Sequence, residues 1–201
     1  MRIVITLILL TFFSSCQISI NKDHVAEGTK LLSQGDYLNA DLEFDDAIFA
    51  DNNNLNAIRG SYICALNMGN YDKALRRVNK YIELKPDSSV GYSDRGGIYL
   101  IKKDYEKALM DFNSVIIRGT NYPTMAYYNK AEALAGLHRF KEAIKSYNTV
   151  IAFNNKDAEA YFKKGIAFSK IDKKDSACLS FKIAYDLKYI EAEKEFNLNC
   201  N

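Results

Sequence analysis

The sequence predicts an all-α fold in which one two-helix module is repeated along the chain. Between residues 92 and 112, apolar or small residues recur at intervals of 4, 3, 6, 3 and 4, namely Tyr92, Gly96, Tyr99, Tyr105, Ala108 and Phe112. Intervals of three and four mark one face of a helix, and the interval of six spans a turn between two helices. The chain has only two prolines, Pro86 and Pro123, and we place both between helices because proline interrupts a helix interior.

The pattern returns at a nearly constant period. The first residue of each second helix recurs every 34 or 35 residues and is aromatic in four of five copies: Tyr37, Tyr71, Tyr105, Phe140 and Lys174. Three residues later every copy has an alanine: Ala40, Ala74, Ala108, Ala143 and Ala177. Alanine there lets two helices cross closely, since a larger side chain would overpack the crossing. The first helices carry a column of mostly small residues: Gly28, Tyr62, Gly96, Ala131 and Gly165.

A helix-turn-helix period of about 34 residues with these columns resembles the tetratricopeptide repeat. The resemblance implies a right-handed α-solenoid of five units, in which the first helices line the concave side. Their boundaries are 21–54, 55–88, 89–122, 124–157 and 158–191. Residues 192–201 carry Ala192 and Phe196 at helical spacing and are expected to form a capping helix, because repeat arrays need terminal covers.

The first residues differ from the repeats. Arg2 precedes an apolar run, and this pattern is typical of a secretory signal over 1–15, because the run is too short to span a bilayer. Ser14 and Ser15 before Cys16 resemble the lipobox of bacterial lipoproteins, which implies lipidation at Cys16 and a lipid-anchored linker over 16–20. Gln17 resembles the residue that directs lipoproteins to the outer membrane. An ordinary cleaved signal or an uncleaved anchor are the alternatives.

The net charge and the cysteines indicate which partners and which covalent links to expect. The formal charge is +2, which gives no general attraction to nucleic acid, so nucleic acid is not an expected partner. Three cysteines remain besides Cys16. We interpret Cys64 as a small residue of the hydrophobic core. Cys178 and Cys200 could form a disulfide if the last helix folds back, and the sequence leaves this open.

The residues do not predict an enzyme, a cofactor or a metal site. His24 and His138 are the only histidines, and we interpret each as isolated from a second metal-type residue at ligand spacing. The acidic residues Asp41, Glu43, Asp45 and Asp46 share one predicted helix, and we interpret them as a solvated face rather than a calcium site.

The resemblance therefore implies a scaffold that binds a protein or peptide partner in its concave groove. The family pattern lines that groove with Asn56, Arg59, Ile63, Asn67, Asp94, Tyr128, Asn129, Glu132, Phe162, Lys163 and Lys170. Capture of a chaperone tail is not expected, because only Asn129 and Lys163 fit the residues by which some members hold a terminal carboxylate. Together with the lipobox, this indicates a membrane-tethered scaffold in the bacterial envelope, with the outer membrane favoured. A self-associating structural protein without a groove ligand is the alternative.

Overall fold

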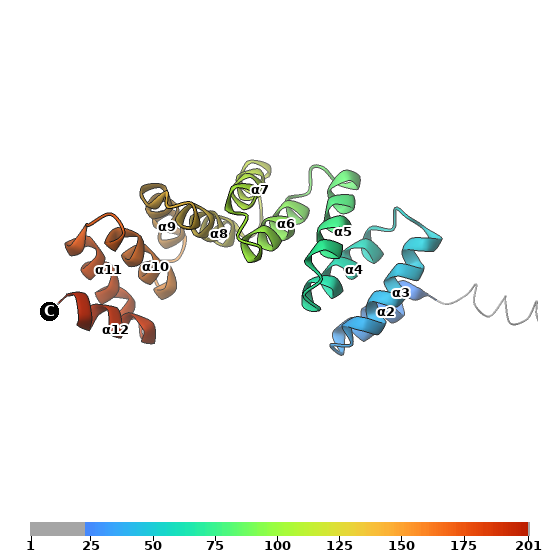
Figure 1. Ribbon diagram of the computed structural model, residues 1–201, viewed down its shortest axis with the longest axis horizontal. Coiled ribbons are helices and arrows are strands. Elements are labelled where there is room, and N and C mark those ends of the chain that lie inside the picture. The colour runs from blue at the N-terminus through green and yellow to red at the C-terminus, as the bar shows by residue number, and fades with distance from the viewer. Residues whose placement is uncertain (1–22, 201) are drawn as a thin grey trace, which may run out of the picture. The chain divides into compact units, whose positions relative to one another are not determined.

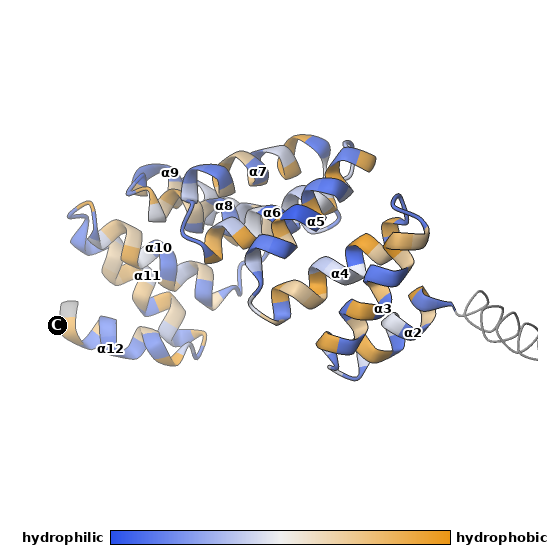
Figure 2. Ribbon diagram, turned by 45° about the vertical axis from the view of Figure 1, so that its right-hand side comes forward, coloured by the Kyte–Doolittle hydropathy of each residue, from blue (hydrophilic) through white to orange (hydrophobic). Residues whose placement is uncertain are grey.

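The structure is a computed structural model that describes residues 23–200. Cys16, the predicted signal and the predicted linker lie outside the described residues. The described part of the chain contains eleven α-helices and no strand, in agreement with the all-α prediction (Figure 1). Figure 2 shows apolar and hydrophilic residues interleaved along the helices, as expected for helices that bury one face and expose the other.

The chain divides inside α5 into two compact units, one ending at Lys80 and one beginning at Tyr81. The helices of the first unit are α2 (His24–Ser33), α3 (Tyr37–Ala50), α4 (Leu55–Asn67) and the larger part of α5 (Tyr71–Leu84). The second unit holds the end of α5 and α6 (Ser89–Ile101), α7 (Tyr105–Arg118), α8 (Pro123–Gly136), α9 (Phe140–Phe153), α10 (Ala158–Ser169), α11 (Lys174–Asp186) and α12 (Ile190–Asn199).

These helices form one helical hairpin in each predicted repeat. Two helices, α8 and α12, begin at positions that differ from the prediction. Pro86 lies between helices as predicted, but the prediction for Pro123 was wrong, because Pro123 is the first residue of α8. Proline is tolerated there, since the first N–H of a helix has no partner within the helix. The last helix begins at Ile190, two residues before the predicted start of the cap at Ala192.

Each hairpin turns through one left-handed residue at the same place in the repeat. These residues have a φ of 78° at Gly35, 72° at Gly69, and 58° at Lys103, His138 and Asp172. The next residue immediately precedes the second helix, and where it is Asp36, Asn70 or Asp104 its side chain caps that helix by accepting a hydrogen bond from an N–H of the first turn. Two adjacent residues therefore make the turn: the left-handed residue reverses the chain, and the residue after it can satisfy a free N–H at the start of the second helix.

The core of each repeat is a small residue set against an aromatic ring. The five column alanines are almost completely buried. A Cβ built on Gly96 would lie 2.9 Å from Phe112, and one built on Gly165 would lie 2.6 Å from Phe181. In the second repeat the large and the small residue are exchanged. Tyr62 occupies the position that is small in the other repeats, Val78 occupies the position that is aromatic in the others, and both are buried. The repeat thus preserves the filled volume rather than the residue type at each column.

The acidic residues of α3 do not all lie on the solvated face that the sequence suggested: Asp46 is exposed, whereas Asp41, Glu43 and Asp45 are buried or half-buried. Asp41 is only 8% exposed. Lys73 Nζ donates to Asp41 Oδ2 at 2.7 Å and to Asp45 Oδ2 at 2.6 Å, and Arg77 donates to Asp45 Oδ1 at 2.8 Å. Burial raises the pKa of the Asp45 carboxyl, but Lys73 and Arg77 outweigh burial and hold that pKa below its ordinary value. The solvated-face prediction was wrong for Asp41 and Asp45, because their partners come from a helix of the next repeat.

The cysteines have separate structural roles. Cys64 is completely buried, and burial raises the pKa of its thiol to about 11, so that it behaves as a core side chain. Cys178 of α11 forms a disulfide with Cys200, which follows α12, and their Cα atoms lie 5.4 Å apart. Ala192 is fully buried, and the ring of Phe196 stacks on Tyr185 with centroids 6.3 Å apart. The last helix therefore covers the final repeat and is covalently held there.

Candidate functional site

Two hollows lie next to each other in the second unit. We call the first the Tyr122 hollow; it has a volume of about 510 Å³ and is lined by Asn121, Tyr122, Pro123, Thr124, Met125, Tyr128, Asn129, Asp157 and Glu159. The second, the Glu132 hollow, has a volume of about 570 Å³ and receives side chains from helices α6 to α10. Tyr128, Asn129 and Glu159 line both hollows, so we treat the two together as one groove.

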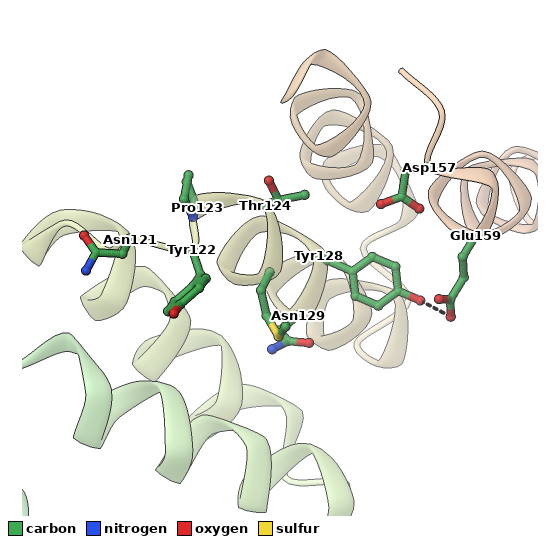
Figure 3. A pocket seen from close by; sticks show the side chains of 9 residues that line it. Asn121, Tyr122, Pro123, Thr124, Tyr128, Asn129, Asp157 and Glu159 are labelled. Atoms are coloured by element: carbon green, nitrogen blue, oxygen red, sulfur yellow. Dashed lines mark hydrogen bonds between the residues drawn. The ribbon is translucent and has the colours of Figure 1, made fainter. Parts of the chain in front are cut away.

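The helix starts position the side chains of the groove. Pro123 begins α8, and this places Tyr128, Asn129 and Glu132 within two turns of one helix, facing α10. Asp157 caps α10 by accepting a hydrogen bond from the N–H of Ala160 at 3.0 Å. In Figure 3, Asn121 and Tyr122 lie at one side of the Tyr122 hollow, Asp157 and Glu159 lie at the other, and Tyr128 and Asn129 lie between them.

Hydrogen bonds connect α8 to its neighbours across the groove. The Tyr128 hydroxyl donates to Glu159 Oε1 at 2.6 Å, and Lys163 Nζ donates to Glu132 Oε2 at 3.0 Å. The Tyr147 hydroxyl donates to Glu132 as well. Burial, followed by the hydrogen bond to Glu159 and the charge of Glu132, raises the pKa of Tyr128 far above its ordinary value. Tyr128 is therefore a neutral hydroxyl donor at physiological pH.

The structure brings four of the predicted groove residues together in the second unit and leaves three outside. Tyr128, Asn129, Glu132 and Lys163 line the groove. Phe162 instead packs between Phe181 and Tyr189, with ring centroids at 5.8 Å and 5.2 Å, because its position on α10 faces α11 and the start of α12. Lys170 is exposed and follows the last residue of α10. Asp94 lies half-buried on α6 and lines neither hollow.

The first unit has a smaller hollow of its own, of about 220 Å³. Asn56, Arg59 and Ile63, which the family pattern assigned to the groove, line this hollow. Asn67 does not, because its side chain donates to the carbonyl oxygen of Ile63 at 2.8 Å, one turn back on the same helix.

The sequence pattern did not predict the residues on the two sides of the Tyr122 hollow, namely Tyr122 on one side and Asp157 and Glu159 on the other. Tyr122 lies in the connection that holds the extra residue of the third interval, and Asp157 and Glu159 lie at the start of α10. The longer third interval was the available signal for Tyr122. The two acids carried no distinguishing pattern, because aspartate and glutamate are common at helix starts.

One group of metal-type side chains was also missed. His24, Glu43 and Asp46 place one ligand atom each within 4.8 Å of one another, so His24 is not isolated as predicted. The fold accounts for this, since α2 and α3 are antiparallel and bring residues 19 positions apart into contact. His24 Nδ1 lies 2.8 Å from Glu43 Oε2 and 3.9 Å from Asp46 Oδ2, which is the geometry of a hydrogen-bonded pair with a second carboxylate nearby.

No helix among the described residues is long and apolar enough to cross a membrane. Residues 1–22, which contain the predicted signal and Cys16, lie outside that search.

Comparison with known families identifies the repeat. Residues 65–126 match a family model described as a tetratricopeptide repeat, and residues 133–172 match one described as a TPR repeat. The chain contains tetratricopeptide repeats. Solved TPR structures are similar over most of its length: a MamA protein at 22% identity, with a TM-score of 0.77 over 85% of this chain and 92% of that chain. YrrB, titled a TPR protein with an unusual peptide-binding site, has a TM-score of 0.78 at 17% identity, over 90% of this chain and 96% of that chain.

The curated relatives of this TPR protein are much longer proteins. Anaphase-promoting complex subunit 3 of Schizosaccharomyces pombe is 28% identical over 164 residues, 82% of this chain and 24% of that protein. The Hsp70-Hsp90 organizing protein of Triticum aestivum is 26% identical over 61% of this chain and 20% of its own length. Serine/threonine-protein phosphatase 5 of Rattus norvegicus is 30% identical over 46% of this chain and 18% of its own length. The chain thus spans about a quarter or less of these relatives, and no phosphatase activity carries over to it.

Proposed function

We propose that this TPR protein binds an extended segment of a partner protein in the groove formed by the Tyr122 hollow and the Glu132 hollow. The observation that carries the proposal is the continuity of the two hollows. Because Tyr128, Asn129 and Glu159 line both, the two hollows form one groove along α8 and α10, with lining residues between 121 and 136 and between 157 and 167. Helical repeats recognise peptides through exposed side chains on one rigid face.

Asn129 is the residue best placed to hold the backbone of such a segment. It is half-buried where the two hollows meet, and its side chain makes no hydrogen bond to another described residue. A carboxamide has both donors and an acceptor, which match the C=O and N–H groups of an extended chain. YrrB, with its peptide-binding site, shares the fold, and this likeness supports binding of the same general kind.

Replacing Asn129 by alanine is expected to weaken peptide binding about tenfold, since two hydrogen bonds to the peptide backbone are lost. Fluorescence polarisation with a pool of labelled, randomised short peptides measures this on the full chain. Asn113→Ala is the matched control, because Asn113 lies on α7 and lines neither hollow. Equal affinities for both variants and the parent would show that peptides bind elsewhere, and the absence of binding by any of them would remove the proposed function.

We also propose that the repeats are tethered to the bacterial envelope through a lipid on Cys16, with the outer membrane favoured. The lipobox-like segment supports this. The Cys178–Cys200 disulfide is consistent with it, because disulfides persist in oxidising compartments such as the periplasm and are rare in the cytosol.

The variant Cys16→Ser is expected to move the protein from the membrane fraction to the soluble fraction, because the acceptor of the lipid is gone. Fractionation followed by mass spectrometry of the mature N-terminus measures both location and modification. Ser19→Ala, in the same linker, should remain membrane-bound. A parent protein whose mature N-terminus carries no lipid would rule the anchor out.

A further inference from the structure

The Tyr122 hollow carries two acids and no basic side chain in its lining. Asp157 uses Oδ1 to cap α10, and Glu159 uses Oε1 to accept the hydrogen bond from Tyr128. The other oxygen of each carboxylate makes no hydrogen bond to a described residue. Both acids line the hollow, and Figure 3 shows them on the side opposite Tyr122.

The neighbouring Glu132 hollow differs in its balance of charge. There Lys163 lies 3.0 Å from Glu132 and compensates its charge. The uncompensated negative charge of the groove is therefore concentrated at Asp157 and Glu159.

The opposite side of the Tyr122 hollow is apolar and accessible. Tyr122 is 74% exposed and Met125 is 61% exposed, although both line a concave surface. In Figure 3 the ring of Tyr128 lies between Tyr122 and the two acids. A hollow with an apolar wall, an aromatic ring and carboxylates at the far side matches a long aliphatic stem that ends in a cation.

We propose that the Tyr122 hollow binds a lysine or arginine side chain of the peptide segment that occupies the groove. This inference depends on the proposed function, and it adds that the bound peptide segment carries a positively charged side chain at this place. The stem of the basic residue packs on Tyr122 and Met125, while its cationic head donates to the free oxygens of Asp157 and Glu159. An acidic side chain at the same place would meet two like charges and is disfavoured.

The experiment compares three labelled peptide pools that differ at one central position: arginine, neutral citrulline of nearly the same shape, and glutamate. Binding to the full chain is measured by fluorescence polarisation at low and high salt. We expect the arginine pool to bind about tenfold more tightly than the citrulline pool, as for a hydrogen bond to a charged group, with the difference shrinking at high salt. The glutamate pool should bind most weakly.

The variants Asp157→Asn and Glu159→Gln remove charge while keeping local structure. Asparagine still caps a helix, and the glutamine oxygen still accepts from the Tyr128 hydroxyl. Each is expected to reduce the preference for arginine over citrulline at least severalfold, because the preference depends on the charge that the substitution removes. Asp104→Asn is the matched control: Asp104 caps α7 in the same way and lines neither hollow.

Three outcomes distinguish a failure of the proposed cation site from a failure of the proposed peptide binding. If the pools bind equally and the two variants change nothing, the cation site is wrong while peptide binding stands. If no pool binds, the proposed function and this inference both fail. If free arginine competes as well as the arginine pool, the hollow holds a small cation rather than a peptide side chain, which overturns the proposal.

Discussion

Replacing Arg95 by methionine is expected to lower the free energy of unfolding by about 3 kcal/mol, because it leaves a buried carboxylate without its partner. Asp111 is 4% exposed. Arg95 donates to both of its oxygens, through Nε at 2.8 Å and through a terminal nitrogen at 2.7 Å. Such two-point pairs between α6 and α7 are strong and directional. Denaturant unfolding followed by circular dichroism measures the loss.

Arg139→Met is the matched control, since Arg139 pairs with Glu142 one turn away and both side chains are about half exposed. Exposed pairs of this kind contribute about 0.5 kcal/mol. The double variant Arg95→Met with Asp111→Leu should recover much of the stability, because no charge remains buried. Equal losses for Arg95→Met and Arg139→Met would contradict the importance of burial at Asp111.

Replacing Phe44 by alanine is expected to destabilise the first unit by about 4 kcal/mol, near the upper part of the range for such truncations. The ring is 1% exposed and lies between two glycines: a Cβ built on Gly28 would be 2.9 Å from it, and one built on Gly60 would be 2.3 Å from it. Because neither glycine has a side chain that could move into the gap, a cavity remains. Hydrogen exchange of the α2 to α4 amides locates the loss.

The same contact predicts coupling between Phe44 and Gly60. Gly60→Ala alone should be destabilising, because the added methyl group meets the ring, whereas in the Phe44→Leu background it should cost much less. Leu42→Ala on the same helix is the control, since Leu42 is 58% exposed and should change stability by no more than about 0.5 kcal/mol. Additive effects of the Gly60 and Phe44 substitutions would argue against direct contact between the ring and α4.

Much of the groove could be predicted because it follows from the repeat. Tyr128, Asn129, Glu132 and Lys163 occupy first-helix positions that recur with the period, so the family pattern placed them on the lined face. Phe162 occupies the same kind of position but packs under Tyr189, because the chain continues into α12 there. The role of any of these residues in binding stays a prediction.

The sequence by itself determined the all-α repeat fold, the hairpin turns and the buried alanine and aromatic columns, because each follows from spacings within about 34 residues. Only the tertiary structure decided what meets across repeats: Lys73 with Asp41 and Asp45, His24 with Glu43, Cys178 with Cys200, and Tyr122 opposite Asp157 and Glu159. The physical reason is that a period specifies which face of a helix is buried, whereas charge pairs, disulfides and hollows depend on which side chains from different helices come within a few ångströms of each other.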